Sequence, residues 1–126
     1  MRIQKLLILL CVSLFSTFVA IGQTQKEADK FFKQRKYQEA LNIYKSLNNS
    51  TYEVKKNTAY SLKQLYKYKE AQEVYANIIN VDNVDDETYF NYADVLNILG
   101  DYSKAIEYYT KVSEKNKVAL NIEKRI

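Results

Sequence analysis

One residue pattern occurs three times in this chain and leaves little choice of fold. Residues 37–44, 68–75 and 102–109 each read Tyr, two residues, Ala, three residues, Tyr. Nine residues before the first tyrosine of each copy stands a further alanine: Ala28, Ala59 and Ala93. A large apolar residue follows that alanine three positions later: Phe31, Leu62 and Leu96. A pattern that returns in this way is typical of a stack of similar helical hairpins.

The spacing within each copy is helical. In the first copy, Ala28 and Phe31 fall on one side of a helix, and Ala40 and Tyr44 fall on one side of the next. Alanine at the crossing of two helices lets their backbones approach closely, and a large ring fills the space one turn away. We therefore predict a repeat core made of Ala28, Ala40, Tyr44, Ala59, Ala71, Tyr75, Ala93, Ala105 and Tyr109.

Few residues in the chain break helices. It has no proline and only two glycines, Gly22 and Gly100, so an all-α fold with short polar turns is expected. The predicted helices are residues 24–36, 37–48, 51–66, 68–80, 86–99 and 102–116. Their predicted N-caps are Thr24, Ser50, Asp85 and Asp101, and Gly100 suits the helix end before Asp101.

The repeats resemble the tetratricopeptide (TPR) family. Ala71 and Ala105 are 34 residues apart, the TPR period, whereas Ala40 and Ala71 are 31 apart. The tryptophan and the closing proline that are usual in TPR repeats are absent. The resemblance implies a helical-hairpin solenoid of three repeats over residues 23–119, divided at about 23–51, 52–85 and 86–119. Residues 120–126 would begin a capping helix or a truncated fourth repeat.

The first 22 residues have the order of charges and apolar residues found in a secretory signal peptide. Arg2 and Lys5 precede an apolar run over residues 6–21, and Ala20 and Gly22 supply small residues before a cleavage point at Gln23. The run is shorter than the roughly 20 residues that span a bilayer. We expect residues 1–22 to be removed, an exported chain located in the periplasm or at the outer membrane, and no transmembrane span after cleavage.

Charge is distributed unevenly along the chain. Residues 23–69 hold eleven Lys and Arg against four Asp and Glu, while residues 70–126 hold six against eleven. A basic half could indicate nucleic-acid binding, but solvated helix faces explain scattered lysines, and export would separate the chain from nucleic acid. We expect a protein or peptide partner and no nucleic acid.

Several kinds of chemistry are excluded by composition. The chain has no histidine, which excludes Ser-His-Asp triads and histidine-bound zinc. Its only cysteine, Cys11, would leave with the signal. Asp82, Asp85, Asp86 and Glu87 lack the spacing and the glycine of an EF-hand loop, so helix capping explains them better. We predict no enzyme activity, no catalytic residue, no cofactor and no metal.

In TPR proteins one face of the first helices lines a concave groove, and the resemblance carries that face to seven residues of this chain. Tyrosine and phenylalanine there would supply rigid contact area, although plain solvated surface explains them nearly as well. The candidate groove residues are Asp29, Phe32, Tyr60, Lys63, Phe90, Asp94 and Asn97. The Lys and Asn pattern that clamps a peptide's terminal carboxylate in some TPR domains is absent.

Two stretches resemble a narrower group. Residues 28–32 before Tyr37, and residues 86–93 before Gly100-Asp101-Tyr102, resemble the N-terminal TPR region of large OmpA-family envelope proteins. That resemblance implies a scaffold for protein–protein interaction at the bacterial cell envelope, in an OmpA-like outer-membrane assembly. The alternative is a stand-alone periplasmic peptide-binding or chaperone-like TPR module.

Overall fold

The computed structural model describes residues 2–5, 24–48, 50–113, 116–117 and 120–124. Within these residues the regular structure is helical, without strands. The chain divides into two compact units, Met1–Asn48 and Asn49–Ile126. The signal peptide predicted over residues 1–22 lies almost wholly outside the described residues, apart from a helical stretch at 2–5.

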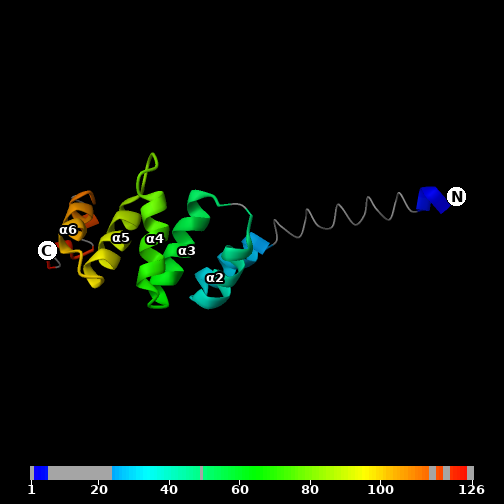
Figure 1. Ribbon diagram of the computed structural model, residues 1–126, viewed down its shortest axis with the longest axis horizontal. Helices are drawn as coiled ribbons and strands as arrows, with labels where there is room; N and C mark the ends of the chain where they lie inside the picture. Colours follow the sequence, from blue (N-terminus) through cyan, green and yellow to red (C-terminus); the bar gives the residue numbers. More distant parts are fainter. Residues whose placement is uncertain (1, 6–23, 49, 114–115, 118–119, 125–126) are drawn as a thin grey trace. The chain divides into compact units, whose positions relative to one another are not determined.

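The first unit contains one helical hairpin. A helical segment over residues 24–33 is followed by α2, Tyr37–Ser46, and the two are drawn in blue and cyan in Figure 1. Ala28 and Ala40 are fully buried, and the ring of Tyr44 packs edge-on against Phe32 with 6.5 Å between ring centroids.

The second unit contains two hairpins and a short final turn. Its helices are α3, Tyr52–Gln64; α4, Tyr68–Ile78; α5, Asp86–Ile98; and α6, Tyr102–Thr110, followed by the 3₁₀ turn η1, Ile122–Lys124. Helix α3 packs on α4, and α5 packs on α6 (Figure 1). Helix α4 also contacts α5, so the two hairpins are stacked on each other.

The nine predicted core residues are all buried. The six alanines are at most 2% exposed and the three tyrosines at most 3%. Alanine has no side chain beyond Cβ, so each crossing brings two backbones together, and the tyrosine of the second helix covers the crossing. The other buried apolar residues of α3, α4 and α5 are Val54, Leu62, Ile78, Tyr92, Val95 and Leu96.

Side-chain caps fix where three helices begin. Asp85 accepts a hydrogen bond from the backbone N–H of Thr88 at 2.7 Å, and Asp101 accepts one from Lys104 at 3.4 Å, as predicted. The prediction for Ser50 is wrong by one residue, because the hydroxyl of Thr51 accepts from the N–H of Val54 at 3.3 Å. Thr51 is the residue with extended backbone beside the first helical turn, which is the position a cap requires.

The turn inside each hairpin has the same backbone. Arg35, Tyr66 and Gly100 each stand two residues before the first tyrosine of the second helix, and their φ angles are 59°, 62° and 85°. In each turn the next residue donates its N–H to a carbonyl five residues earlier: Lys36 to Phe31, Lys67 to Leu62 and Asp101 to Leu96. This left-handed cap closes the first helix. Only the third repeat carries the glycine that adopts it without strain.

The prediction of a last helix over residues 102–116 is wrong, because α6 ends at Thr110. The reason is a contact with the start of α5. Asp86 accepts hydrogen bonds from the backbone N–H of Ser113 at 3.2 Å and from the amide of Asn116 at 2.8 Å. These bonds hold the chain after α6 in a turn, and Val112 beside it is buried.

The shared turn predicts opposite effects for two substitutions. Gly100→Ala should lower the free energy of unfolding by about 1 kcal/mol, since a Cβ at Gly100 meets no atom within 4 Å and the cost is conformational alone. Arg35→Gly should raise it by a similar or smaller amount, because the exposed Arg35 is relieved of the left-handed strain. Urea denaturation would measure both. Equal destabilisation by the two changes would contradict the account of the turn.

Candidate binding face

Helices α3 and α5 lie in contact and bring most of the predicted groove residues into one unit. On α3, Tyr60 stands four residues after Lys56 and three before Lys63, so the three share one helix face. On α5, Asp94 stands four residues after Phe90 and three before Asn97. We call the surface formed by Lys56, Tyr60, Lys63, Phe90, Asp94 and Asn97 the α3–α5 face.

An ion pair ties the two helices together at Lys63. Its Nζ lies 2.8 Å from Oδ2 of Asp94 and 2.8 Å from Oδ1 of Asn91, and 5.7 Å from the centre of the Phe90 ring. Only 13% of the Lys63 side chain and 10% of the Asp94 side chain are exposed. Both charges are therefore compensated within the chain, and a ligand would meet a neutralised pair at this point.

A second lysine, Lys56, forms similar ion pairs nearer the N-terminal end of α3. Nζ of Lys56 lies 2.9 Å from Oδ2 of Asp85 and 3.5 Å from Oε2 of Glu87. Sequence reasoning missed Lys56, although its position seven residues before Lys63 places both on one side of α3. The α3–α5 face thus carries two lysines, and each forms an ion pair with a carboxylate of the next repeat.

Asp94 has a further partner beneath the face. The hydroxyl of Tyr109 on α6 donates to Oδ1 of Asp94 at 2.5 Å, and the Tyr109 ring lies 5.9 Å from that of Phe90. Asp94 therefore serves the core of its own repeat as well as the face. Tyr60 and Asn97, by contrast, are half-buried residues of the surface itself.

The other two predicted groove residues, Asp29 and Phe32, belong to the first unit. Asp29 accepts a hydrogen bond from the hydroxyl of Tyr44 at 2.6 Å, as Asp94 does from Tyr109. Phe32 is half-buried between the rings of Tyr37 and Tyr44, at 5.9 and 6.5 Å. Both side chains contribute to the packing of their own hairpin.

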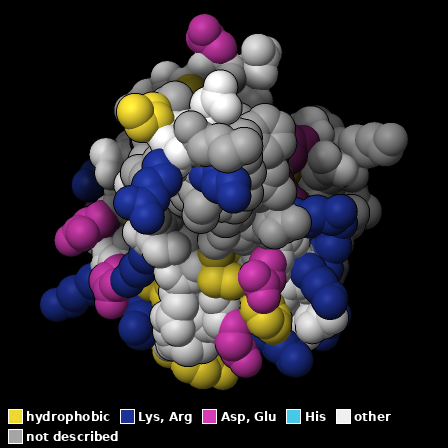
Figure 2. Space-filling view, turned by 90° about the vertical axis from the view of Figure 1, so that its right-hand side faces the viewer, with side chains coloured by type: hydrophobic (Ala, Val, Ile, Leu, Met, Phe, Trp, Pro, Cys, Tyr) yellow, Lys and Arg dark blue, Asp and Glu magenta, His cyan; other side chains and the backbone are white. Residues whose placement is uncertain are grey.

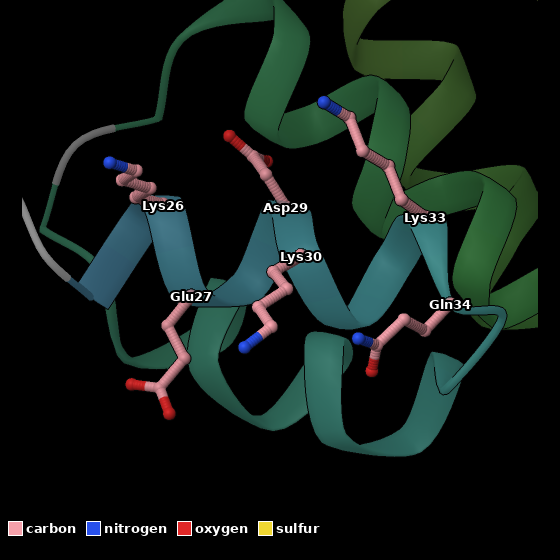
Figure 3. A pocket seen from close by; sticks show the side chains of 6 residues that line it. All are labelled: Lys26, Glu27, Asp29, Lys30, Lys33 and Gln34. Carbon is pink, nitrogen blue, oxygen red and sulfur yellow. The ribbon is translucent and has the colours of Figure 1, made fainter.

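A hollow in the first unit offers no comparable site. It is lined by Lys26, Glu27, Asp29, Lys30, Lys33 and Gln34, all from one helix and the turn after it. Figure 3 shows Lys26, Asp29 and Lys33 pointing to one side of this helix and Glu27, Lys30 and Gln34 to the other. These side chains do not converge on a common point, so they form a solvated helix surface.

An aromatic cluster lies between α4, α5 and α6. The ring of Tyr92 is 5.9 Å from that of Tyr75 and 4.7 Å from that of Tyr108, which in turn lies 6.4 Å from Tyr89. The ammonium group of Lys111 sits 4.5 Å above the Tyr108 ring. Cation–π and ring contacts of this kind stabilise the stack, so these rings contribute to packing.

The acidic cluster before α5 is occupied by contacts within the chain. Asp85 caps α5 and pairs with Lys56, and Asp86 binds the turn after α6. No group of three potential metal ligands occurs among the described residues.

On the molecular face seen in Figure 2, lysine and arginine side chains are dispersed among acidic and apolar ones. In the described part of the chain, none of the helices combines the length and the apolar character needed to cross a bilayer.

Two of these carboxyl groups are held ionised by their partners. Burial by itself would raise the pKa of Asp85, but the ammonium of Lys56 and the N–H and hydroxyl of Thr88 outweigh it and lower that pKa. Hydrogen bonds from Ser113 and Asn116 lower the pKa of Asp86. A depressed folded-state pKa means that the stabilisation is complete above the ordinary carboxyl pKa and is lost as the pH falls through the lower value.

Asp85→Asn should therefore show a pH-dependent loss of stability. The amide still caps α5 but cannot pair with Lys56, so we expect a loss of about 0.5–1 kcal/mol at pH 7 after solvent screening, shrinking towards zero below about pH 4. Denaturation at several pH values measures it. Asp82→Asn, on the exposed turn before α5, is the control and should leave the profile unchanged. A loss independent of pH would contradict the ion-pair account.

No protein-family model matches the chain, and no curated protein matches it. Solved structures do. The C-terminal part of a TPR repeat-containing protein from Cytophaga hutchinsonii aligns with a TM-score of 0.70 and 21% identity over 76% of this chain, which spans 40% of that chain.

Two complexes align as well. The first TPR of Spaghetti (RPAP3), bound to the HSP90 peptide SRMEEVD, gives a TM-score of 0.70 and 21% identity over 83% of this chain and 87% of that chain. PcrH, in complex with the chaperone binding region of PopB, gives a TM-score of 0.63 and 17% identity over 72% of this chain and 76% of that chain. At these identities the likeness establishes the fold, which is that of TPR helical-repeat structures.

Proposed function

We propose that this chain is a non-catalytic TPR scaffold that binds a protein or peptide partner through the α3–α5 face. The observation that carries the proposal is the arrangement of that face. Tyr60 and Phe90 supply half-buried aromatic surface, and two lysine–carboxylate ion pairs lie beside them. Rigid aromatic rings surrounded by polar groups are typical of residues that dominate binding energy. Two of the similar structures hold a peptide or a partner segment on the same fold.

The ion pairs suggest the character of the partner. Lys56 and Lys63 are each paired with carboxylates of α5 and its cap, so little net charge is available to attract an ion from a distance. The partner is therefore recognised by shape and by aromatic contact. A terminal carboxylate would not be its main anchor.

We also propose that the partner is met outside the cytoplasm, at the cell envelope. The support is the N-terminal sequence, with Arg2 and Lys5 before the apolar run of residues 6–21, and the resemblance of residues 28–32 and 86–93 to envelope proteins of the OmpA family. In that role the chain would be one part of an outer-membrane assembly. The alternative is a stand-alone periplasmic peptide-binding or chaperone-like module, and the two neighbours bound to a peptide or a partner region support its binding role.

Capture of peptides tests the binding proposal. A random dodecapeptide display library selected on the immobilised chain should yield binders whose affinity falls about tenfold or more in Tyr60→Ala or Phe90→Ala, as for aromatic anchors of interfaces. Tyr102→Ala, an exposed aromatic at the start of α6, is the matched control and should bind normally. Circular dichroism checks that each variant is folded. Binding unaffected by both changes on the face would sink the proposal.

Export is tested separately. Residues 1–22 fused to a bacterial alkaline phosphatase lacking its own signal should make the enzyme active, because its disulfides form only outside the cytoplasm. A fusion with Arg2 and Lys5 changed to Glu should lose most of that activity. An inactive wild-type fusion that accumulates in the cytosol would contradict the envelope location while leaving the binding proposal intact.

A further inference from the structure

The three tyrosines at the same position of the repeat differ in the hydrogen bonding of their hydroxyl groups. Tyr44 and Tyr109 each donate to an aspartate fifteen residues earlier, Asp29 at 2.6 Å and Asp94 at 2.5 Å. In both repeats that aspartate directly follows the alanine of the first helix. In the middle repeat the tyrosine is Tyr75, and the residue fifteen positions earlier is Tyr60 instead of an aspartate.

The substitution leaves the Tyr75 hydroxyl without an acceptor. Tyr75 is 1% exposed, and its oxygen is the buried side-chain polar atom that finds no hydrogen-bond partner among the described residues. Most buried hydroxyl groups in folded proteins are bonded, because burying one unbonded costs free energy. An acceptor from a bound ligand that reached this hydroxyl would form the missing hydrogen bond, and that bond would add to the binding free energy.

The charges around Tyr75 indicate which acceptor fits. Burial, and then the nearby carboxylates of Glu87, Asp94 and Asp85, raise the pKa of the Tyr75 hydroxyl well above its usual value. The hydroxyl therefore remains a donor at neutral pH, and the two lysines of the face, Lys56 and Lys63, are already paired with carboxylates. A carboxylate that reached this buried hydroxyl would lose its hydration with no unpaired lysine of the face to compensate its charge, whereas a neutral carbonyl oxygen avoids that cost. Backbone and side-chain amides of a peptide carry that group.

Tyr60 lies on the α3–α5 face and close to Tyr75. It stands where the other repeats place their aspartate, it is half-buried, and its phenol lies near enough to affect the pKa of Tyr75. A change of the Tyr60 rotamer, with the backbone of α3 in place, would open that approach. Lys56 and Lys63, one turn to each side, are held in place by their ion pairs.

We propose that the hydroxyl of Tyr75 donates a hydrogen bond to an amide carbonyl oxygen of a peptide bound on the α3–α5 face, once the Tyr60 ring has moved aside. The peptide then supplies from outside the acceptor that Asp29 and Asp94 supply within their own repeats. This inference rests on the proposed peptide-binding function and names the contact by which the middle repeat recognises its ligand.

Tyr75→Phe tests the contact because it removes only the oxygen. Random dodecapeptides are selected by display on the wild-type chain, and the affinity of the selected clones is measured on the variants. The affinity for Tyr75→Phe should fall about three- to tenfold, the value of one neutral hydrogen bond. The melting temperature of the free Tyr75→Phe chain should equal or exceed that of the wild type, since an unsatisfied group has been removed.

Tyr44→Phe is the matched control in the first unit. It loses a bonded hydroxyl, so it should melt below the wild type and still bind the selected peptides. Equal affinity of wild type and Tyr75→Phe would overturn the inference while leaving peptide binding established. The same holds if Tyr75→Phe melts as low as Tyr44→Phe, which would show that a buried water or another group already satisfies the hydroxyl.

Two further outcomes are also decisive. If changing one Asp or Glu of the selected peptide to its amide abolishes the difference between wild type and Tyr75→Phe, the acceptor is a carboxylate and the neutral-carbonyl assignment is wrong. If no peptide is enriched on the wild-type chain, the proposed function fails and this contact fails with it.

Discussion

The packing of one tyrosine over one alanine crossing is the interaction on which each hairpin depends. Ala28, Ala59 and Ala93 let the second helix approach, and Tyr44, Tyr75 and Tyr109 close the space above the crossing. A tyrosine in this position must bury a hydroxyl group as well as a ring. An aspartate next to the alanine accepts from that hydroxyl in the first and third repeats, and in the third repeat the same aspartate belongs to the α3–α5 face, which connects the core to the surface.

The acceptors in turn organise the α3–α5 face. Asp94 receives the Tyr109 hydroxyl on one oxygen and the Lys63 ammonium on the other, so a residue of the core also fixes a lysine of the surface. Lys56 is fixed in the same way by Asp85, the N-cap of α5. Such residues hold the face in one arrangement, which would reduce the ordering cost of binding the proposed partner. Tyr60 is the exception, because it replaces the acceptor that the pattern of the other repeats requires.

Much of this fold could be predicted from the sequence. The spacing of Ala and Tyr shows the hairpins and their core, and Asp85, Asp101 and Gly100 mark helix ends because capping is a local interaction. The end of α6 could not be predicted in this way, since Asp86 binds Ser113 from 27 residues away. The left-handed turns at Arg35 and Tyr66 could not be predicted from the sequence, because neither residue is the glycine that usually marks such a turn.

The candidate site was predicted as a set of positions, and its contacts were not. The Lys63–Asp94 pair joins residues 31 apart in different repeats, so it depends on how one hairpin packs on the next. The tyrosine–aspartate bonds had a readable signal, the spacing of fifteen residues in the first and third copies and its loss in the second. Tyr75 differs from Tyr44 and Tyr109 in lacking an aspartate at that spacing.

The most direct test of the account is a pair of double-mutant cycles on the free chain. The coupling energy between Tyr44→Phe and Asp29→Ala should be about 1–3 kcal/mol in favour of the wild-type pair, as for a hydrogen bond to a charged acceptor. The cycle of Tyr75→Phe with Tyr60→Ala should give a coupling within about 0.5 kcal/mol of zero, because no bond links these hydroxyls. Equal coupling in the two cycles would contradict the claim that the middle repeat alone leaves its buried hydroxyl unbonded.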